Sequence, residues 1–114
     1  MSNPSFKKFD IDKRKISDYC FNGSHPIGKH KARLFKSLLG FSANDTDLFI
    51  SLLNEALVRH PFIELKRDRF GIRYACDVKI RNFDKEAWVR TIWILEELSA
   101  NPRLVTAYIA PIEL

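Results

Sequence analysis

The stretch Ile72-Arg73-Tyr74-Ala75-Cys76-Asp77-Val78-Lys79-Ile80 decides the fold class of this 114-residue chain. Its apolar side chains fall on every second residue, which is the period of a strand with one buried and one solvated face. Half-buried strands of this kind are typical of antiparallel sheets. Turn-forming residues lie on both sides of the stretch, at 67–71 and at 82–85. The stretch therefore predicts a strand joined by tight turns to a neighbour before it and another after it.

Three more segments complete the predicted sheet. Residues 62–66 form a strand before the first turn. Residues Trp88–Leu95 form a strand after the second turn, and because both of its faces are apolar we expect it to lie inside the sheet, with Trp88 and Trp93 in the core. A loop over residues 96–102 leads to the last strand, Arg103–Ile109.

Before Pro61 the apolar residues recur at helical spacing instead. Three helices are predicted: from about Asp12 to Cys20, from Gly28 or Lys29 to Leu39, and from a cap at Ser42 or Asn44 to about His60. The order of elements predicts an α+β fold, with N-terminal helices packed on a four-stranded antiparallel β-sheet. We expect residues 1–10 to be a loose lead-in and residues 11–114 to form one domain.

Composition and charge narrow the functional classes. The 46% apolar content, with nine Phe, argues against disorder. No apolar run approaches the roughly 18 residues of a membrane span, and the charged N-terminus lacks the apolar stretch of a secretory signal. Residues 1–36 carry nine Lys or Arg and three Asp or Glu, so the net charge of +5 belongs to the first third of the chain. Such a local excess favours a polyanionic partner, and a solvated terminus is the alternative.

Neither the two cysteines nor any common catalytic motif supports a metal-dependent or redox function. Cys20 and Cys76 each fall in an apolar pattern and are expected to be buried thiols, with a disulfide between them as the alternative. The sequence has no phosphate-binding loop, no dinucleotide fingerprint and no zinc-protease motif. We expect neither a metal nor another cofactor.

A basic segment, His25-Pro26-Ile27-Gly28-Lys29-His30-Lys31-Ala32-Arg33, leads into the second predicted helix. Helix N-termini attract anions, and Lys and Arg bind phosphate. Histidine, with an ordinary pKa of about 6.5, transfers protons near neutral pH. This segment is therefore a candidate phosphate-binding and catalytic site, and an exposed basic helix start is the alternative.

Two strands carry further candidates. By simple alternation, Leu104, Thr106 and Tyr108 of the last strand are expected to share one face. The two hydroxyl groups can donate hydrogen bonds to a phosphate, although Thr and Tyr also simply favour strands. Arg90 is expected on the face opposite Trp93, either as a phosphate ligand or as a partner of Asp77 or Glu86.

Together these segments resemble a family of small uncharacterised bacterial domains over roughly residues 11–109. The resemblance is carried by Asp18-Tyr19, His25-Pro26-Ile27-Gly28, Lys31-Ala32-Arg33, Gly71-Ile72-Arg73-Tyr74, Val89-Arg90-Thr91-Ile92-Trp93-Ile94 and Pro102-Arg103-Leu104-Val105-Thr106-Ala107-Tyr108. More widely, helices before a four-stranded sheet that ends in Thr-x-Tyr resemble the barnase, EndoU, colicin D and RelE-type ribonucleases. In that superfamily a proline is expected directly after the aromatic residue, whereas here it comes three positions later, at Pro111.

The wider resemblance implies a metal-independent endoribonuclease, a bacterial toxin domain that cleaves RNA, tRNA included, by attack of the 2′-hydroxyl. It implies a cognate immunity or antitoxin protein as a second partner and no membrane partner. Action in the cytoplasm is expected, with delivery as part of a larger secreted toxin as one route. As catalytic residues the resemblance implies Thr106 and Tyr108 directly and His25, His30 and Lys31 as candidates. At the phosphate it implies Arg33 as a candidate, and from their positive charge we also expect Lys29, Arg90 and Arg103 there. The alternative is a non-catalytic module that binds nucleic acid or protein, such as an antitoxin or interaction domain.

Overall fold

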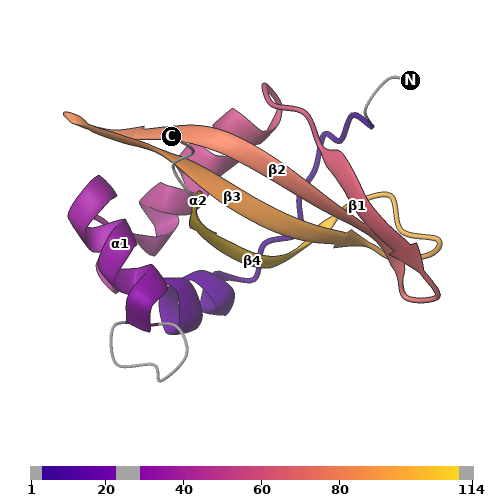
Figure 1. Cartoon of the computed structure of the whole chain (residues 1–114), viewed down its shortest axis with the longest axis horizontal. Coiled ribbons are helices and arrows are strands. Elements are labelled where there is room, and N and C mark those ends of the chain that lie inside the picture. The colour runs from indigo at the N-terminus through magenta and orange to yellow at the C-terminus, as the bar shows by residue number, and fades with distance from the viewer. Residues whose placement is uncertain (1–3, 23–28, 111–114) are drawn as a thin grey trace.

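The computed structural model describes residues 4–22 and 29–110. It has the predicted α+β fold, in which an N-terminal helical part packs on a four-stranded antiparallel sheet (Figure 1). The helical elements are a π-helix η1 (Lys15–Cys20), α1 (Lys29–Leu39), a 3₁₀ turn η2 (Ala43–Asp45) and α2 (Thr46–Leu57). The strands are β1 (Ile63–Asp68), β2 (Gly71–Asn82), β3 (Lys85–Leu95) and β4 (Arg103–Ile109).

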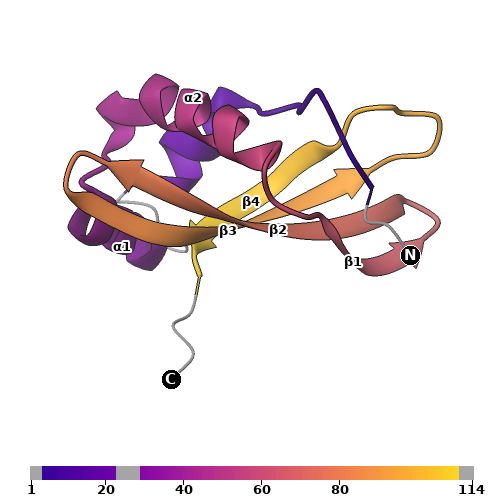
Figure 2. The same cartoon turned by 90° about the horizontal axis from the view of Figure 1, so that it is seen from above.

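The sheet runs in the order β1-β2-β3-β4, so every strand pairs with its neighbour in sequence. This order places β3 inside the sheet, as its two apolar faces predicted. In Figure 2, α2 lies above the sheet, and the opposite face of β1 and β2 points away from it. The sheet therefore has a helix-covered face and an open face.

The core lies between the helices and the covered face. It takes the alternate residues of β2 that the sequence singled out and joins them to the apolar stripes of α1 and α2. Trp93 is fully buried there, and its indole N–H donates a hydrogen bond to Thr91 Oγ1 at 2.7 Å. Phe6 and Phe9 of the N-terminal segment also pack against this core, and Phe9 lies 5.7 Å from the Trp93 ring centroid. Cys20 and Cys76 are both buried free thiols, as predicted.

The prediction that Trp88 lies in the core is wrong. Strand alternation sends Val89, Thr91 and Trp93 to the covered face, so Trp88 falls with Arg90 on the open face. Trp88 is 47% exposed, and its ring meets the edge of His60 at 5.6 Å. Apolar residues on both sides of β3 thus indicate an open face that is partly apolar, not a second core.

The prediction that Leu104, Thr106 and Tyr108 share one face is also wrong. Along β4, Leu104 pairs with Trp93 whereas Thr106 pairs with Ile92, so Val105 is an extra residue in a β-bulge. The bulge lets Leu104 stay fully buried in the core while Thr106 and Tyr108 lie on the other face. Without the bulge, strict alternation would put Thr106 and Tyr108 on the same face as Leu104. Both hydroxyl-bearing side chains would then lie in the core with it.

Within residues 4–22 and 29–110, no helix has the length and apolar content that crossing a membrane requires.

Candidate functional site

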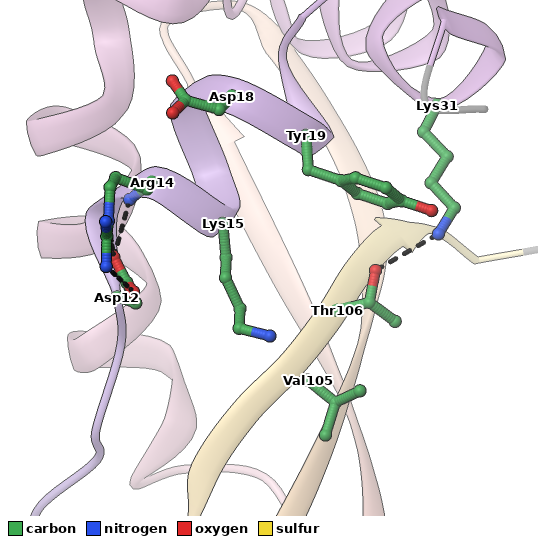
Figure 3. A pocket seen from close by; sticks show the side chains of 8 residues that line it. All are labelled: Asp12, Arg14, Lys15, Asp18, Tyr19, Lys31, Val105 and Thr106. Carbon is green, nitrogen blue, oxygen red and sulfur yellow. Dashed lines mark hydrogen bonds and ion pairs between the residues drawn. The ribbon is translucent and has the colours of Figure 1, made fainter. Parts of the chain in front are cut away.

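Three elements that are distant in sequence enclose a pocket of about 700 Å³ at the free edge of β4. They are η1 together with the residues just before it, the first turn of α1, and the bulged part of β4 (Figure 3). The lining residues are Asp12, Arg14, Lys15, Asp18, Tyr19, Lys31, Val105 and Thr106. The bulge contributes directly, because it turns Val105 and Thr106 toward this pocket.

Lys31 connects the pocket to the open face of the sheet. Its Nζ donates a hydrogen bond to Thr106 Oγ1 at 3.2 Å. The same nitrogen lies 5.1 Å from the centroid of the Tyr19 ring and 5.2 Å from that of Tyr108. A cation within about 6 Å of an aromatic face is attracted by the ring quadrupole. The Lys31 ammonium group is therefore held in place by a hydroxyl group and two rings.

The hydrogen bond leaves donors for a ligand. A lysine ammonium has three protons and uses one on Thr106, so two remain. Thr106 Oγ1 accepts that bond, which leaves its own hydroxyl proton able to donate. Lys31 and Thr106 can thus present several donors to one anion, and charge-assisted bonds to phosphate are among the stronger hydrogen bonds.

The other charges around the pocket are partly matched. The Arg14 guanidinium hydrogen-bonds Asp12, with Nη2 at 3.2 Å from Oδ2, and these bonds lower the pKa of the Asp12 carboxyl. Figure 3 shows Lys15 and Lys31 extending toward β4 from η1 and α1, with Asp18 turned away from Lys31. Among the described residues, no carboxylate lies within ion-pair distance of Lys15 or Lys31. The pocket therefore offers the Lys31 charge beside Thr106 and a second positive charge, Lys15, on its wall.

Arg90 lies on the open face, next to this pocket. It is the cross-strand partner of Tyr108 and makes a two-pronged ion pair with Asp77, with Nε–Oδ1 at 2.8 Å and Nη2–Oδ2 at 2.9 Å. The hydrogen bonds to Asp77 raise the pKa of Arg90, so the guanidinium stays charged. Asp77 and Glu86 were the two predicted partners of Arg90, and Asp77 is the one that pairs with it in the structure.

The residues predicted from sequence divide into three groups. Lys31, Thr106 and Tyr108 come together, and Arg90 adjoins them. Arg33 is exposed and, two residues after Lys31, lies on the far side of α1, and Arg103 pairs with Glu96 at 2.9 Å without lining the pocket. His25 and the side chains of Lys29 and His30 lie outside the described part of the chain.

Sequence reasoning missed the contribution of η1. Lys15 and Tyr19 line the pocket from one turn of a π-helix, a rare conformation that is frequent at functional sites. The available signal was their spacing of four residues, which places two side chains on one helix face. It was hidden because Tyr19 also forms an apolar face with Ile16 and Cys20, at the i, i+3, i+4 spacing of a core-facing helix.

Neither a metal site nor an unsatisfied buried group appears in the described residues. No three His, Cys, Asp or Glu side chains come together there in a way that would hold a metal ion. Every buried polar side-chain atom in this part of the chain has a hydrogen-bond partner.

Comparison with known proteins gives one match. Residues 2–111 match the model of a protein family described as "Domain of unknown function (DUF6883)". No curated protein and no solved structure matches the chain.

Proposed function

This chain belongs to the DUF6883 family of domains of unknown function, and we propose that it is a metal-independent endoribonuclease acting at the Lys31–Thr106 site. The observation that carries the proposal is the position of Lys31 Nζ, which lies 3.2 Å from Thr106 Oγ1 and beside the rings of Tyr19 and Tyr108. A preorganised cation and hydroxyl group at a pocket edge suit a phosphate that gains negative charge during a reaction.

The reaction proposed is cleavage by the 2′-hydroxyl of the RNA. A base takes the 2′-hydroxyl proton while the 2′-oxygen forms a bond to phosphorus. The bond from phosphorus to the 5′-oxygen then breaks, and an acid gives that oxygen a proton. The products are a 2′,3′-cyclic phosphate and a 5′-hydroxyl, so atoms and protons balance without an added water.

Four described residues have a place in this chemistry. Lys31 and Lys15 offset the extra negative charge on the phosphorane, as positive groups aimed at developing charge do. Thr106 donates to a non-bridging oxygen, and Tyr108 orients the phosphate from the open face. Each proton transfer by a positioned side chain contributes roughly 10²–10⁴-fold.

The proton-transfer groups proposed are the two histidines of the basic segment. His30 directly precedes Lys31 in the sequence, and His25 precedes it by six residues. A histidine pair covers both roles, because one neutral imidazole accepts a proton while one imidazolium donates. Of the residues expected at the phosphate, Arg90 adjoins the described site and supplements the affinity for phosphate in the proposal. Arg33, on the far side of α1, and Arg103, paired with Glu96, are not given this role.

The biological role proposed is that of a toxin domain acting on RNA in the cytoplasm, tRNA included. A cognate immunity or antitoxin protein is its proposed second partner. Support for this role is the resemblance of the helices-then-sheet order and the Thr106-x-Tyr108 strand to toxin ribonucleases.

The experiment is an RNA cleavage assay on the full chain, with total tRNA and a mixed-sequence RNA in the presence of EDTA. We expect fragments ending in a 2′,3′-cyclic phosphate, lost in His25→Ala or His30→Ala and weakened in Thr106→Ala. A substrate with 2′-deoxy nucleotides should stay intact. No cleavage together with salt-dependent RNA binding would overturn the enzymatic proposal in favour of a binding module. Neither cleavage nor binding would favour a protein partner.

A further inference from the structure

We propose that a groove on the open face of the sheet binds one unpaired nucleobase of the RNA, beside the phosphate held at Lys31. The substrate class would then be single-stranded RNA. This inference rests on the proposed function, because it assigns the part of the substrate that adjoins the cleaved phosphate.

The groove has a volume of about 480 Å³, which falls within the usual range for small-ligand pockets. Its floor is formed by β2 and β3, where the small side chain of Ala75 leaves room above the sheet. One wall comes from β1 and from Pro61, two residues before it, and the other comes from β4. The lining residues are Pro61, Ile63, Leu65, Ala75, Asp77, Arg90, Ile92 and Tyr108.

Tyr108 joins the groove to the phosphate site. Its side chain lines the groove, and its ring also lies 5.2 Å from Lys31 Nζ. A nucleotide whose phosphate contacts Lys31 and Thr106 would therefore have Tyr108 between its phosphate and its base. No residue lines both pockets, and Tyr108 connects them because it lines the groove while its ring faces Lys31 of the phosphate site.

The chemistry of the groove matches a base. Nucleobases have apolar faces that stack on apolar and aromatic side chains, and polar edges that carry donors and acceptors. Ile63, Leu65 and Ile92 supply apolar surface, and Ile63 and Leu65 are 49% and 55% exposed. Asp77 offers acceptor oxygens and Arg90 offers N–H donors beside them. A base inside a duplex presents neither its faces nor its pairing edge, so the groove requires an unpaired nucleotide.

The ion pair between Asp77 and Arg90 lies outside the core, on the groove side of the sheet. Asp77 and Arg90 have side chains 39% and 34% exposed and lie on the face away from the core. A charged pair set among exposed isoleucine and leucine side chains gives the open face one polar position where the edge of a base can be read.

The test measures binding, so that cleavage is not needed. The probes are a short single-stranded RNA made uncleavable by 2′-fluoro groups, its duplex, and a base-free ribose-phosphate chain of the same length. The proteins are the wild type, Ala75→Leu, which fills the groove, and Ala43→Leu, which adds the same bulk to an exposed residue of η2. Lys31→Ala serves as the phosphate-site variant, and circular dichroism checks that each variant folds.

We expect the wild type and Ala43→Leu to bind the single-stranded RNA at least about tenfold more tightly than the base-free chain, as stacking of a base would give. The preference should disappear in Ala75→Leu, and the duplex should bind more weakly than the single strand. Equal binding of the two single chains by the wild type, or an unchanged preference in Ala75→Leu, would overturn the base site. If Lys31→Ala weakens binding while Ala75→Leu does not, only the base site fails. Absence of RNA binding by the wild type would overturn both proposals.

Discussion

Lys31 and Thr106 are 75 positions apart in the chain, yet Lys31 Nζ donates a hydrogen bond to Thr106 Oγ1 at 3.2 Å. This bond ties the first turn of α1 to the middle of β4. It brings Lys31 of the basic segment to the strand that carries the two candidate hydroxyl groups. The chemistry proposed for the domain depends on this juxtaposition.

The Thr106 hydroxyl group is expected to matter more for activity than for folding. Thr106→Val keeps the shape of the side chain but removes the donor to the phosphate, so RNA cleavage should fall by about 10²-fold. Thr106→Ser keeps the hydroxyl and should stay within a few-fold of the wild type. Initial rates on one labelled RNA measure both. Equal activity of the Val and Ser variants would remove Thr106 from the proposed site.

The bulge at Val105 makes a prediction about strand register. Deleting Val105 restores plain alternation and leaves Leu104 on the core face and Thr106 on the open face, so the variant should still fold. Deleting Ala107 instead brings Tyr108 to the core face at a fully buried position, which should unfold the domain or lower its melting temperature strongly. Thermal unfolding followed by circular dichroism compares the two. Equal loss in both variants would contradict the register.

Periodicity was sufficient to predict the elements of this fold. Apolar residues alternate from Ile72 to Ile80 and recur at helical spacing before Pro61. These two patterns indicate which side chains are buried, and the pattern of burial determines the fold class. The sequence did not reveal the bulge at Val105, because an inserted residue looks the same as a regular one until its pairing partners are known. The prediction for Trp88 was wrong for a related reason, since an aromatic residue gives the same sequence signal on an exposed face as in a core.

The candidate site was predictable in part. Lys31, Thr106 and Tyr108 were recognisable by residue type, and the structure shows that they meet. Lys15 and Tyr19 were not, because their role depends on how η1 packs against β4. Arg103 was expected at the phosphate because of its charge, but its guanidinium pairs with Glu96.

Two glycines should respond differently to the same substitution. At Gly71, with φ +133°, an added Cβ would lie 2.3 Å from the carbonyl oxygen of Leu95, so Gly71→Ala should cost about 2 kcal/mol or more. At Gly40, with φ +71°, the nearest atoms would be side-chain atoms of Asn82 and Lys85 at 3.6 Å. Gly40→Ala should cost only about 1 kcal/mol, from the left-handed backbone. Urea unfolding measures the loss of stability in both variants. A larger loss in Gly40→Ala than in Gly71→Ala would contradict this prediction.

Burial of Cys76 predicts a loss of stability in alkali. Burial raises the pKa of this thiol from an ordinary value of 9.0 to about 12. Between these values the unfolded chain releases the proton while the folded chain keeps it, so rising pH favours the unfolded state. The free energy of unfolding should fall from about pH 9 toward pH 12, and less steeply in Cys76→Ala. Urea titrations across this range measure both slopes, and identical slopes would contradict the raised pKa.

The most direct test of the proposed function compares two lysines of α1. Lys31 contacts Thr106, whereas Lys36 is exposed on the same helix. The measurement is the rate of RNA cleavage in EDTA by the wild type, Lys31→Ala and Lys36→Ala, each checked for folding. The account predicts cleavage by the wild type and Lys36→Ala, and a loss of at least about 10²-fold in Lys31→Ala. Cleavage by Lys31→Ala at the wild-type rate, or no cleavage by any of the three, would contradict it.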